Sequence, residues 1–215
     1  MNHITRAKKE LKNLNATNQA FKSLIQGMTK EQAYQCYLTN KGIYHYNTIE
    51  TKTEFAAMNH KRCSFCTKRI SDFHMVMTIE HIETKRDCPQ KIYEWENLLC
   101  ACRACNTKRS TNKYVPNKYL DPTKLPEIET YFSFDIDGSI APNQALSEKA
   151  QEQARYMIQL YKLDRDELNV ERREFFHHLL DDEYFEILKK RSKDSMDIHF
   201  LSVFTYYKRR MDNGQ

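Results

Sequence analysis

Two CxxC pairs stand in the middle of the chain, Cys63-Ser64-Phe65-Cys66 and Cys102-Arg103-Ala104-Cys105, with 35 residues between them. Each pair turns the backbone tightly enough for two thiolates to bind one ion, and two pairs supply the four sulfur ligands of a tetrahedral site. The gap is longer than in a simple zinc ribbon, so we expect a unit the size of a β-hairpin between the pairs. The sequence therefore predicts a structural Zn2+ held by Cys63, Cys66, Cys102 and Cys105.

Between and directly after these pairs stands a fixed order of polar residues: Glu80-His81-Ile82, then Glu96-Asn97-Leu98, then Asn106. This order resembles the HNH nucleases, whose ββα-metal fold carries an acidic residue and a histidine on its first strand, a middle asparagine, and an asparagine or histidine at the start of its helix. The pattern CxxC…(D/E)HI…ENL…CxxCN is matched in order across residues 63–106. The resemblance implies a small ββα-metal motif embedded in the chain and stapled by the zinc site.

The resemblance also implies a role for each residue. Phosphodiester hydrolysis needs a base that takes a proton from water, and the imidazole of His81 titrates near neutral pH. Glu80 and Asn106 would supply hard oxygen ligands for a catalytic Mg2+ or Mn2+, and Asn97 would brace the loop behind His81. Adjacent residues on a regular strand point to opposite faces, so Glu80 and His81 can share a site only where the strand ends or bends. The expected phosphate contacts are Lys85, Arg86, Lys108 and Arg109.

A second resemblance covers part of the chain after this segment. Its motifs are Leu120-Asp121-Pro122, Tyr131 to Ile140, Leu160 to Arg165, and Glu171-Arg172-Arg173. They are similar to the tail of bacterial HNH proteins of anti-phage defence, the PtuB-like proteins of Septu systems and their retron-associated relatives. An ABC-type ATPase, PtuA, acts with those nucleases. The resemblance therefore implies a PtuA-like partner, a nucleic-acid substrate that is DNA by default, and room for a homo-oligomer within the larger complex.

Helical periodicity dominates the rest of the chain, so we expect a mainly α protein. A helical stretch is predicted over residues 18–39, in two pieces with Thr17 and Thr29 as N-caps, and another over 49–60 with Thr48 as N-cap. Further helices are expected after Ser147, near 166–191 and near 195–211.

Strands are expected in two places. One is the β-rich run at residues 75–79, and the other is a hairpin that joins 132–136 to 139–141 through a two-residue Asp137-Gly138 turn. We divide the chain into an N-terminal helical region (1–60), the HNH nuclease core with its zinc knuckles (61–113), and a hairpin with the C-terminal helices (114–215).

The formal net charge of +5 is unevenly distributed. Residues 1–60 carry +4, residues 61–113 carry +5 and residues 114–215 carry −4. Basic residues therefore concentrate where a polyanion such as nucleic acid would dock. Four zinc thiolates with one Zn2+ add −2, which leaves the central segment able to neutralise few phosphates. We therefore expect a large partner protein, and we expect the apolar run from Ile198 to Tyr207 to be partly exposed for docking.

Other features limit the class of protein. Residues 1–14 have no apolar leader core, and no apolar run approaches the roughly 20 residues that span a bilayer, so we expect a cytoplasmic protein with no membrane segment. In that compartment Cys36, Cys88 and Cys100 are expected to be free thiols.

Three alternatives to a defence nuclease stay open. They are a stand-alone restriction-type HNH endonuclease, an effector that cleaves host RNA, and a non-catalytic zinc-binding adaptor. The first would need its own sequence-reading module, and the sequence contains no helix-turn-helix or zinc-finger array.

Overall fold

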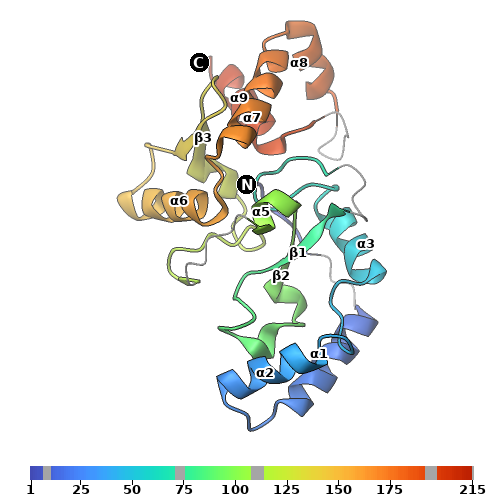
Figure 1. Cartoon of the computed structure of the whole chain (residues 1–215). Coiled ribbons are helices and arrows are strands. Elements are labelled where there is room, and N and C mark those ends of the chain that lie inside the picture. Colours follow the sequence, from blue (N-terminus) through green and yellow to red (C-terminus); the bar gives the residue numbers. More distant parts are fainter. Residues whose placement is uncertain (7–10, 71–75, 108–113, 192–197, 215) are drawn as a thin grey trace.

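The computed structural model describes residues 1–6, 11–70, 76–107, 114–191 and 198–214. The protein is elongated: helices from the N-terminal part of the sequence form one end, helices from the C-terminal part form the other, and a small sheet lies between them (Figure 1). The expectation of a mostly helical protein with small sheets is confirmed. Among the described helices, none has the length and apolar character needed to cross a membrane.

Three helices make up the N-terminal end: α1 (Lys12–Leu24), α2 (Lys30–Asn40) and α3 (Ile49–Met58). The helix α2 begins at its predicted cap. Thr29 Oγ1 accepts a hydrogen bond from Gln32 N, and the Gln32 side chain accepts one from Thr29 N, so two backbone donors at the helix start are satisfied. Thr48 caps α3 as predicted, because its hydroxyl accepts from Thr51 N.

The predicted start of α1 is wrong. The helix begins at Lys12, and Thr17 lies inside it instead of capping it. Leu14 and Phe21 are both buried and stand seven residues apart, so one apolar face continues past Thr17 toward the N-terminus.

The middle of the chain forms an antiparallel pair of strands, β1 (Thr78–His81) and β2 (Leu98–Ala101). Two short 3-10 turns, η1 (Pro89–Lys91) and η2 (Trp95–Asn97), lie on the connection between them. The short helix α5 (Arg103–Thr107) follows β2 and packs on both strands.

The predicted strand at 75–79 is misplaced. Val76 and Met77 precede β1, which continues to His81, and Met75 lies outside the described residues. Thr78 pairs with Ala101, the last residue of β2. Because Cys102 turns the chain into the second cysteine pair, β2 offers no partner to the residues before Thr78.

A second antiparallel pair, β3 (Phe132–Phe134) and β4 (Ile140–Pro142), follows the turn η3 (Ile128–Tyr131). The predicted hairpin is confirmed, whereas its two-residue turn is wrong. Asp135 N donates to Ser139 O at 3.1 Å, so three residues close the loop, and Gly138 has a φ of +85°. A Cβ atom at Gly138 would lie 1.9 Å from the Asn169 carbonyl oxygen, so the turn needs glycine for close packing as well as for its φ.

The C-terminal end contains α6 (Glu148–Tyr161), α7 (Asp166–Leu179), α8 (Asp182–Lys189) and α9 (Leu201–Asp212). Ser147 caps α6, and its hydroxyl accepts from Ala150 N. The helical region predicted near 166–191 consists of two helices, α7 and α8. Asp181 accepts from Tyr184 N at 2.9 Å and caps a new helix, so the chain breaks between α7 and α8.

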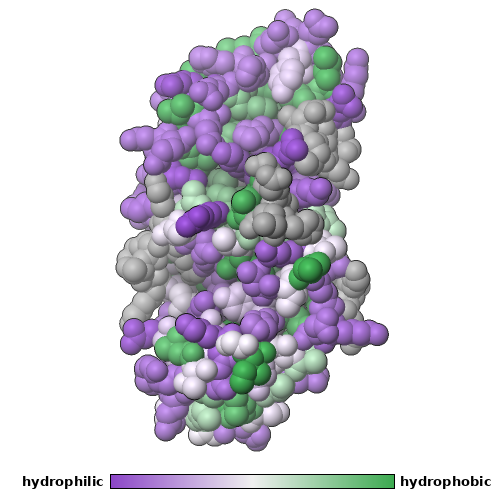
Figure 2. Space-filling model, turned by 45° about the vertical axis from the view of Figure 1, so that its right-hand side comes forward, coloured by the Kyte–Doolittle hydropathy of each residue, from purple (hydrophilic) through white to green (hydrophobic). Residues whose placement is uncertain are grey.

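In the apolar run from Ile198 to Tyr207, residues 198–204 are buried apart from half-buried His199, so the predicted exposure is wrong there. Residues 205–207 are half-buried, and docking through them stays a prediction. Ile198 is 1% exposed, and its carbonyl oxygen accepts from Arg62 Nη2 at 2.7 Å. The hydroxyl oxygens of Thr67 and Ser202 lie 2.7 Å apart. This segment therefore packs beside the first cysteine pair. It belongs to the predicted C-terminal region (114–215) but contacts the predicted nuclease core (61–113), and that division of the chain stays a prediction. On the face shown in Figure 2, hydrophobic side chains lie in small separate patches.

Candidate active site and metal centre

The two cysteine pairs meet in space. Cys63 and Cys66 lie on a tight turn in which Thr67 N donates to Cys63 O at 3.0 Å, and Thr67 has a φ of +59°. Cys102 directly precedes α5 and Cys105 lies within it. The four sulfur atoms lie within 4.8 Å of one another, and those of Cys66 and Cys102 are 3.9 Å apart. Zn–S bonds of about 2.3 Å in a tetrahedron separate the sulfurs by about 3.8 Å. The four cysteines are thus close enough to bind a metal and compatible with structural zinc.

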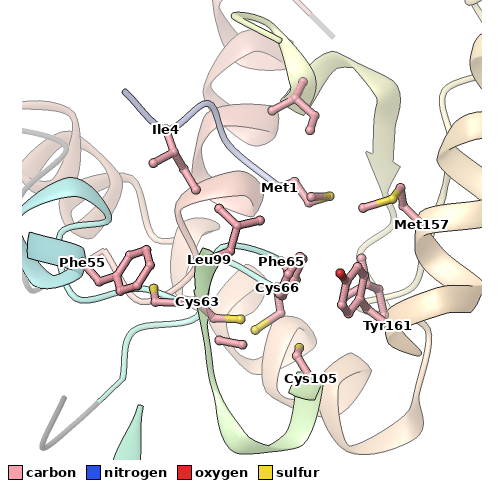
Figure 3. Close-up of a cluster of buried hydrophobic side chains, with 14 of the residues drawn as sticks. Met1, Ile4, Phe55, Cys63, Phe65, Cys66, Leu99, Cys105, Met157 and Tyr161 are labelled. Atoms are coloured by element: carbon pink, nitrogen blue, oxygen red, sulfur yellow. The ribbon is translucent and has the colours of Figure 1, made fainter. Parts of the chain in front are cut away.

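Cationic and aromatic side chains surround this cluster. Arg165 Nη1 and Nη2 lie 3.7 and 3.8 Å from Cys105 Sγ. Arg172 is 1% exposed, and burial lowers its pKa to about 10, while the negative charge of nearby cysteines acts in the opposite direction. Phe65 stacks on Tyr161 with ring centroids 3.7 Å apart, beside the sulfur atoms (Figure 3). Both guanidiniums can offset the charge of −2 that four thiolates and one Zn2+ would carry in this largely dry setting.

His81 is the last residue of β1, and its side chain is 4% exposed. Its Nε2 lies 2.9 Å from the carbonyl oxygen of Ile92, and since a carbonyl can only accept, Nε2 carries the proton. Burial and the nearby Lys85 ammonium lower the pKa of His81 to about 3, against the opposing effect of the bond to Ile92. The imidazole is therefore neutral at pH 7, with Nδ1 as its unprotonated nitrogen.

The side chain of Asn97 closes the loop between the two strands. Its Oδ1 accepts from Glu83 N at 2.8 Å, and its Nδ2 donates to Glu83 O at 3.1 Å and to Lys91 O at 3.0 Å. Glu83 lies two residues after His81, and Lys91 directly precedes Ile92, whose carbonyl meets the imidazole. The three bonds of Asn97 therefore hold both ends of the loop that orients His81.

Arg6 holds the turn that carries Asn97, a role the sequence did not indicate. Its Nη1 donates to Trp95 O at 2.8 Å, and its Nη2 donates to Glu96 O and Leu98 O, each at 2.9 Å. The guanidinium carbon also lies 5.3 Å from the centroid of the Trp95 ring. One cation thus binds three carbonyls, two just before Asn97 in the sequence and one just after it. The only signal in the sequence is an arginine about 90 residues away, and nothing in its surroundings points to this turn.

The two residues predicted to hold the catalytic metal lie on neighbouring elements. Glu80 is 6% exposed and pairs in register with Leu99 of β2. Asn106 is half-buried on α5, which packs on β1. Glu80 and His81 are the last two residues of β1, and both pair in register with β2, so a site shared by their side chains stays a prediction.

The predicted phosphate contacts have different surroundings. The Lys85 ammonium lies between two tyrosine hydroxyls, 3.1 Å from Tyr46 Oη and 3.4 Å from Tyr37 Oη. Arg86 is exposed. Lys108 and Arg109 lie outside the described residues. The free thiols expected at Cys36, Cys88 and Cys100 are confirmed.

The class of protein that this arrangement resembles is the HNH nucleases. A histidine ends the first of two antiparallel strands, an amide side chain closes the loop between them, and a short helix begins directly after Cys102. These features occur in the order that the resemblance implies.

Two named proteins give the resemblance a more particular form. Septu protein PtuB of Bacillus thuringiensis is 29% identical over 72 residues, which cover 34% of this chain and 28% of PtuB. The retron Vc95 putative HNH endonuclease of Vibrio cholerae serotype O1 biovar El Tor is 28% identical over 124 residues, which cover 55% of this chain and 59% of that protein. The chain thus spans less than two thirds of either relative, and no protein-family model matches it. The predicted resemblance to HNH proteins of the Septu and retron kind is confirmed.

Proposed function

We propose that this chain is a metal-dependent HNH nuclease that hydrolyses phosphodiester bonds in nucleic acid, with DNA as the default substrate. The observation that carries the proposal is how the loop between β1 and β2 is closed and how it contacts His81. Asn97 closes it, and its Ile92 carbonyl sets which nitrogen of His81 is protonated. The name of the retron relative, a putative HNH endonuclease, supports the same activity.

In this proposal His81 is the general base. The imidazole is neutral at pH 7 and its Nε2 proton is committed to Ile92, so Nδ1 takes the proton from the attacking water. Asn97 and Arg6 act as positioning residues, because they hold the loop and the turn without being assigned a bond to the substrate.

Two different metals fit two sets of ligands in this proposal. Glu80 and Asn106 would hold Mg2+ or Mn2+, since carboxylate and amide oxygens are the ligands these ions prefer. That ion would stabilise the negative charge that builds on the phosphate oxygens during hydrolysis. The four cysteines would hold Zn2+, which contributes folding free energy and leaves the chemistry to the other residues.

The test compares His81→Ala with His45→Ala, whose side chain is exposed. Cleavage of labelled DNA and RNA with Mg2+ should fall by about 10²–10⁴-fold in His81→Ala, because a positioned general base contributes about that factor. His45→Ala should cleave like the wild type, and both variants should keep their zinc and their circular dichroism. A His81→Ala variant that cleaves at near wild-type rate would show that another group is the base. The preferred substrate of the wild type also decides between DNA and RNA.

We further propose that the nuclease is the effector subunit of an anti-phage defence complex that contains an ABC-type ATPase. The similarity to Septu protein PtuB supports this, and so does the charge of residues 61–113, which is +5 before four zinc thiolates and their ion subtract 2. A segment that neutralises few phosphates binds nucleic acid weakly at physiological salt. The test is purification of the chain alone and together with the products of neighbouring genes, with mass, nucleic-acid binding and cleavage measured for each. A chain that cleaves as fast alone as in any complex would contradict the partner.

A further inference from the structure

The ring of His81 packs against the ring of Tyr46. The two ring centroids lie 4.8 Å apart with an interplanar angle of 86°, and the side chain of His81 is 4% exposed. A water molecule must come within about 3 Å of the base nitrogen to lose its proton, and a phosphodiester must stand beside that water. The buried imidazole cannot contact a water molecule with a phosphodiester beside it while Tyr46 and the other neighbouring side chains keep their positions. Something must move before the proposed reaction can begin.

Tyr46 lies on the linker of residues 41–47, which joins α2 to α3. Tyr44 and Tyr46 turn partly inward on this linker, whereas Ile43 and His45 are exposed. Within the described chain, the backbone of residues 45–47 forms no backbone–backbone hydrogen bond. The contact is therefore held mainly by the side chain of Tyr46, and moving it does not require a helix or strand to unfold.

Lys85 anchors that side chain. Its Nζ donates to Tyr46 Oη at 3.1 Å and to Tyr37 Oη at 3.4 Å, and it lies 5.5 Å from the centroid of each ring. Lys85 follows His81 by four residues, so the anchor and the proposed base belong to the same loop. A phosphate is a stronger partner for this ammonium than two neutral hydroxyls, because its negative charge adds Coulomb attraction to the hydrogen bond.

We propose that Tyr46 is a cover over His81 and that a phosphate bound by Lys85 releases it, so that the site opens when a phosphate-bearing substrate arrives. The proposal rests on the proposed nuclease function for its purpose, although its geometry stands without it. The closed and open states differ in whether the Lys85 ammonium bonds Tyr46 or phosphate. Phosphate shifts the balance because it binds the open state better.

The experiment measures access to His81 directly. The full chain is treated with diethyl pyrocarbonate without added Mg2+, and the carbethoxylation rate of each histidine is followed by peptide mass spectrometry, with exposed His45 as the internal standard. His81 should react at least about tenfold more slowly than His45, in proportion to the small fraction of time the cover is open. Tyr46→Ala should raise the His81 rate by about the same factor.

Two further variants and one probe separate the anchor from the ring. Tyr46→Phe keeps the ring but loses the bond to Lys85, so the His81 rate should rise part of the way. Tyr44→Phe, which removes a hydroxyl from the same linker, should leave it unchanged. Inorganic phosphate should raise the rate in the wild type compared with chloride at equal ionic strength, and it should have no effect in Lys85→Met.

Protection of His81 in Tyr46→Ala equal to that in the wild type would refute the cover. A wild-type rate that ignores phosphate, or a Tyr46→Phe rate equal to the wild-type rate, would refute the release by Lys85. Zinc content and circular dichroism identify a misfolded Tyr46→Ala, in which case Tyr46→Phe decides. Because none of these readouts uses cleavage, the two proposals can fail separately. If Tyr46→Ala and phosphate both raise the His81 rate, but the protein cleaves no nucleic acid either alone or with its partner, the cover stands and the nuclease function is refuted.

Discussion

Replacing Arg6 with alanine should impair the site without removing any residue assigned to substrate or metal. The lost guanidinium donates to the carbonyl oxygens of Trp95, Glu96 and Leu98 at 2.8–2.9 Å. Hydrogen bonds from a charged group contribute about 1.5–3 kcal/mol each, and water replaces only some of them, so the free energy of unfolding should fall by about 3–5 kcal/mol.

The lost bonds should loosen the turn that carries Asn97. Because Asn97 closes the loop that orients His81, that loop should be displaced as well. A displacement of about 1 Å in such a loop lowers a rate on the order of 100-fold, so kcat should fall while KM changes little. Arg6→Lys should be intermediate, because an ammonium lacks the planar fork that binds three carbonyls at once. Free guanidinium in the assay should partly restore kcat in Arg6→Ala.

The assays are urea unfolding and single-turnover cleavage, both with zinc content measured on the same samples. A double-mutant cycle with Asn97→Ala should show a combined loss smaller than the sum of the single losses, because both side chains hold one loop. The reasoning fails if Arg6→Ala loses stability but cleaves at the wild-type rate well below its unfolding temperature. It also fails if the two losses are additive.

Three other outcomes follow from the geometry. The pKa of His81 is about 3 in the folded chain and about 6.5 in the unfolded one, so the unfolded state takes up the proton first and stability falls as pH drops through that window. Between pH 7.5 and 5.5, with zinc saturating, the wild type should lose about 1.4 kcal/mol more than His81→Gln in urea unfolding, and equal losses would show that His81 is not buried as a neutral group. About one zinc per chain should survive mild chelation in the wild type and in Cys36→Ser but not in Cys105→Ser; cleavage lost to EDTA should return with Mg2+ or Mn2+, and recovery only with Zn2+ would contradict two separate metals. Removing the chain from Ile198 onward should weaken zinc binding in a chelator competition, because Arg62 loses the acceptor that Ile198 supplies. An unchanged affinity would show that the C-terminal segment does not support the cysteine pair.

Local signals in the sequence were sufficient for several elements. Thr29 and Thr48 cap helices as predicted, because an N-cap depends on a side chain and a backbone group three residues away. The spacing of the cysteines likewise predicted a cluster that the fold brings together. The hairpin was found from alternation and glycine, although its three-residue loop depends on how closely α7 approaches Gly138.

The remaining features depend on contacts between residues far apart in the chain. Arg6 binds carbonyls about 90 residues later, and Tyr46 packs against a histidine 35 residues later, so no short pattern contains either pair. The burial of Ile198 could not be predicted for the same reason. An apolar run has the same composition whether it meets solvent, a partner protein or residues 62–69 of its own chain.

The bond between Arg62 and Ile198 also sets an order of events during synthesis. The two residues are 136 positions apart, and a ribosome adds about 5–20 residues per second, so about 7–27 s pass between their appearance. Throughout that interval the first cysteine pair exists without the segment that packs on it, and Arg62 has no access to its acceptor at Ile198. A nascent chain that ends between residues 105 and 198 therefore has all four cysteines but lacks part of the packing around them. The packing around the four cysteines is in this way completed only when the C-terminal segment has been translated.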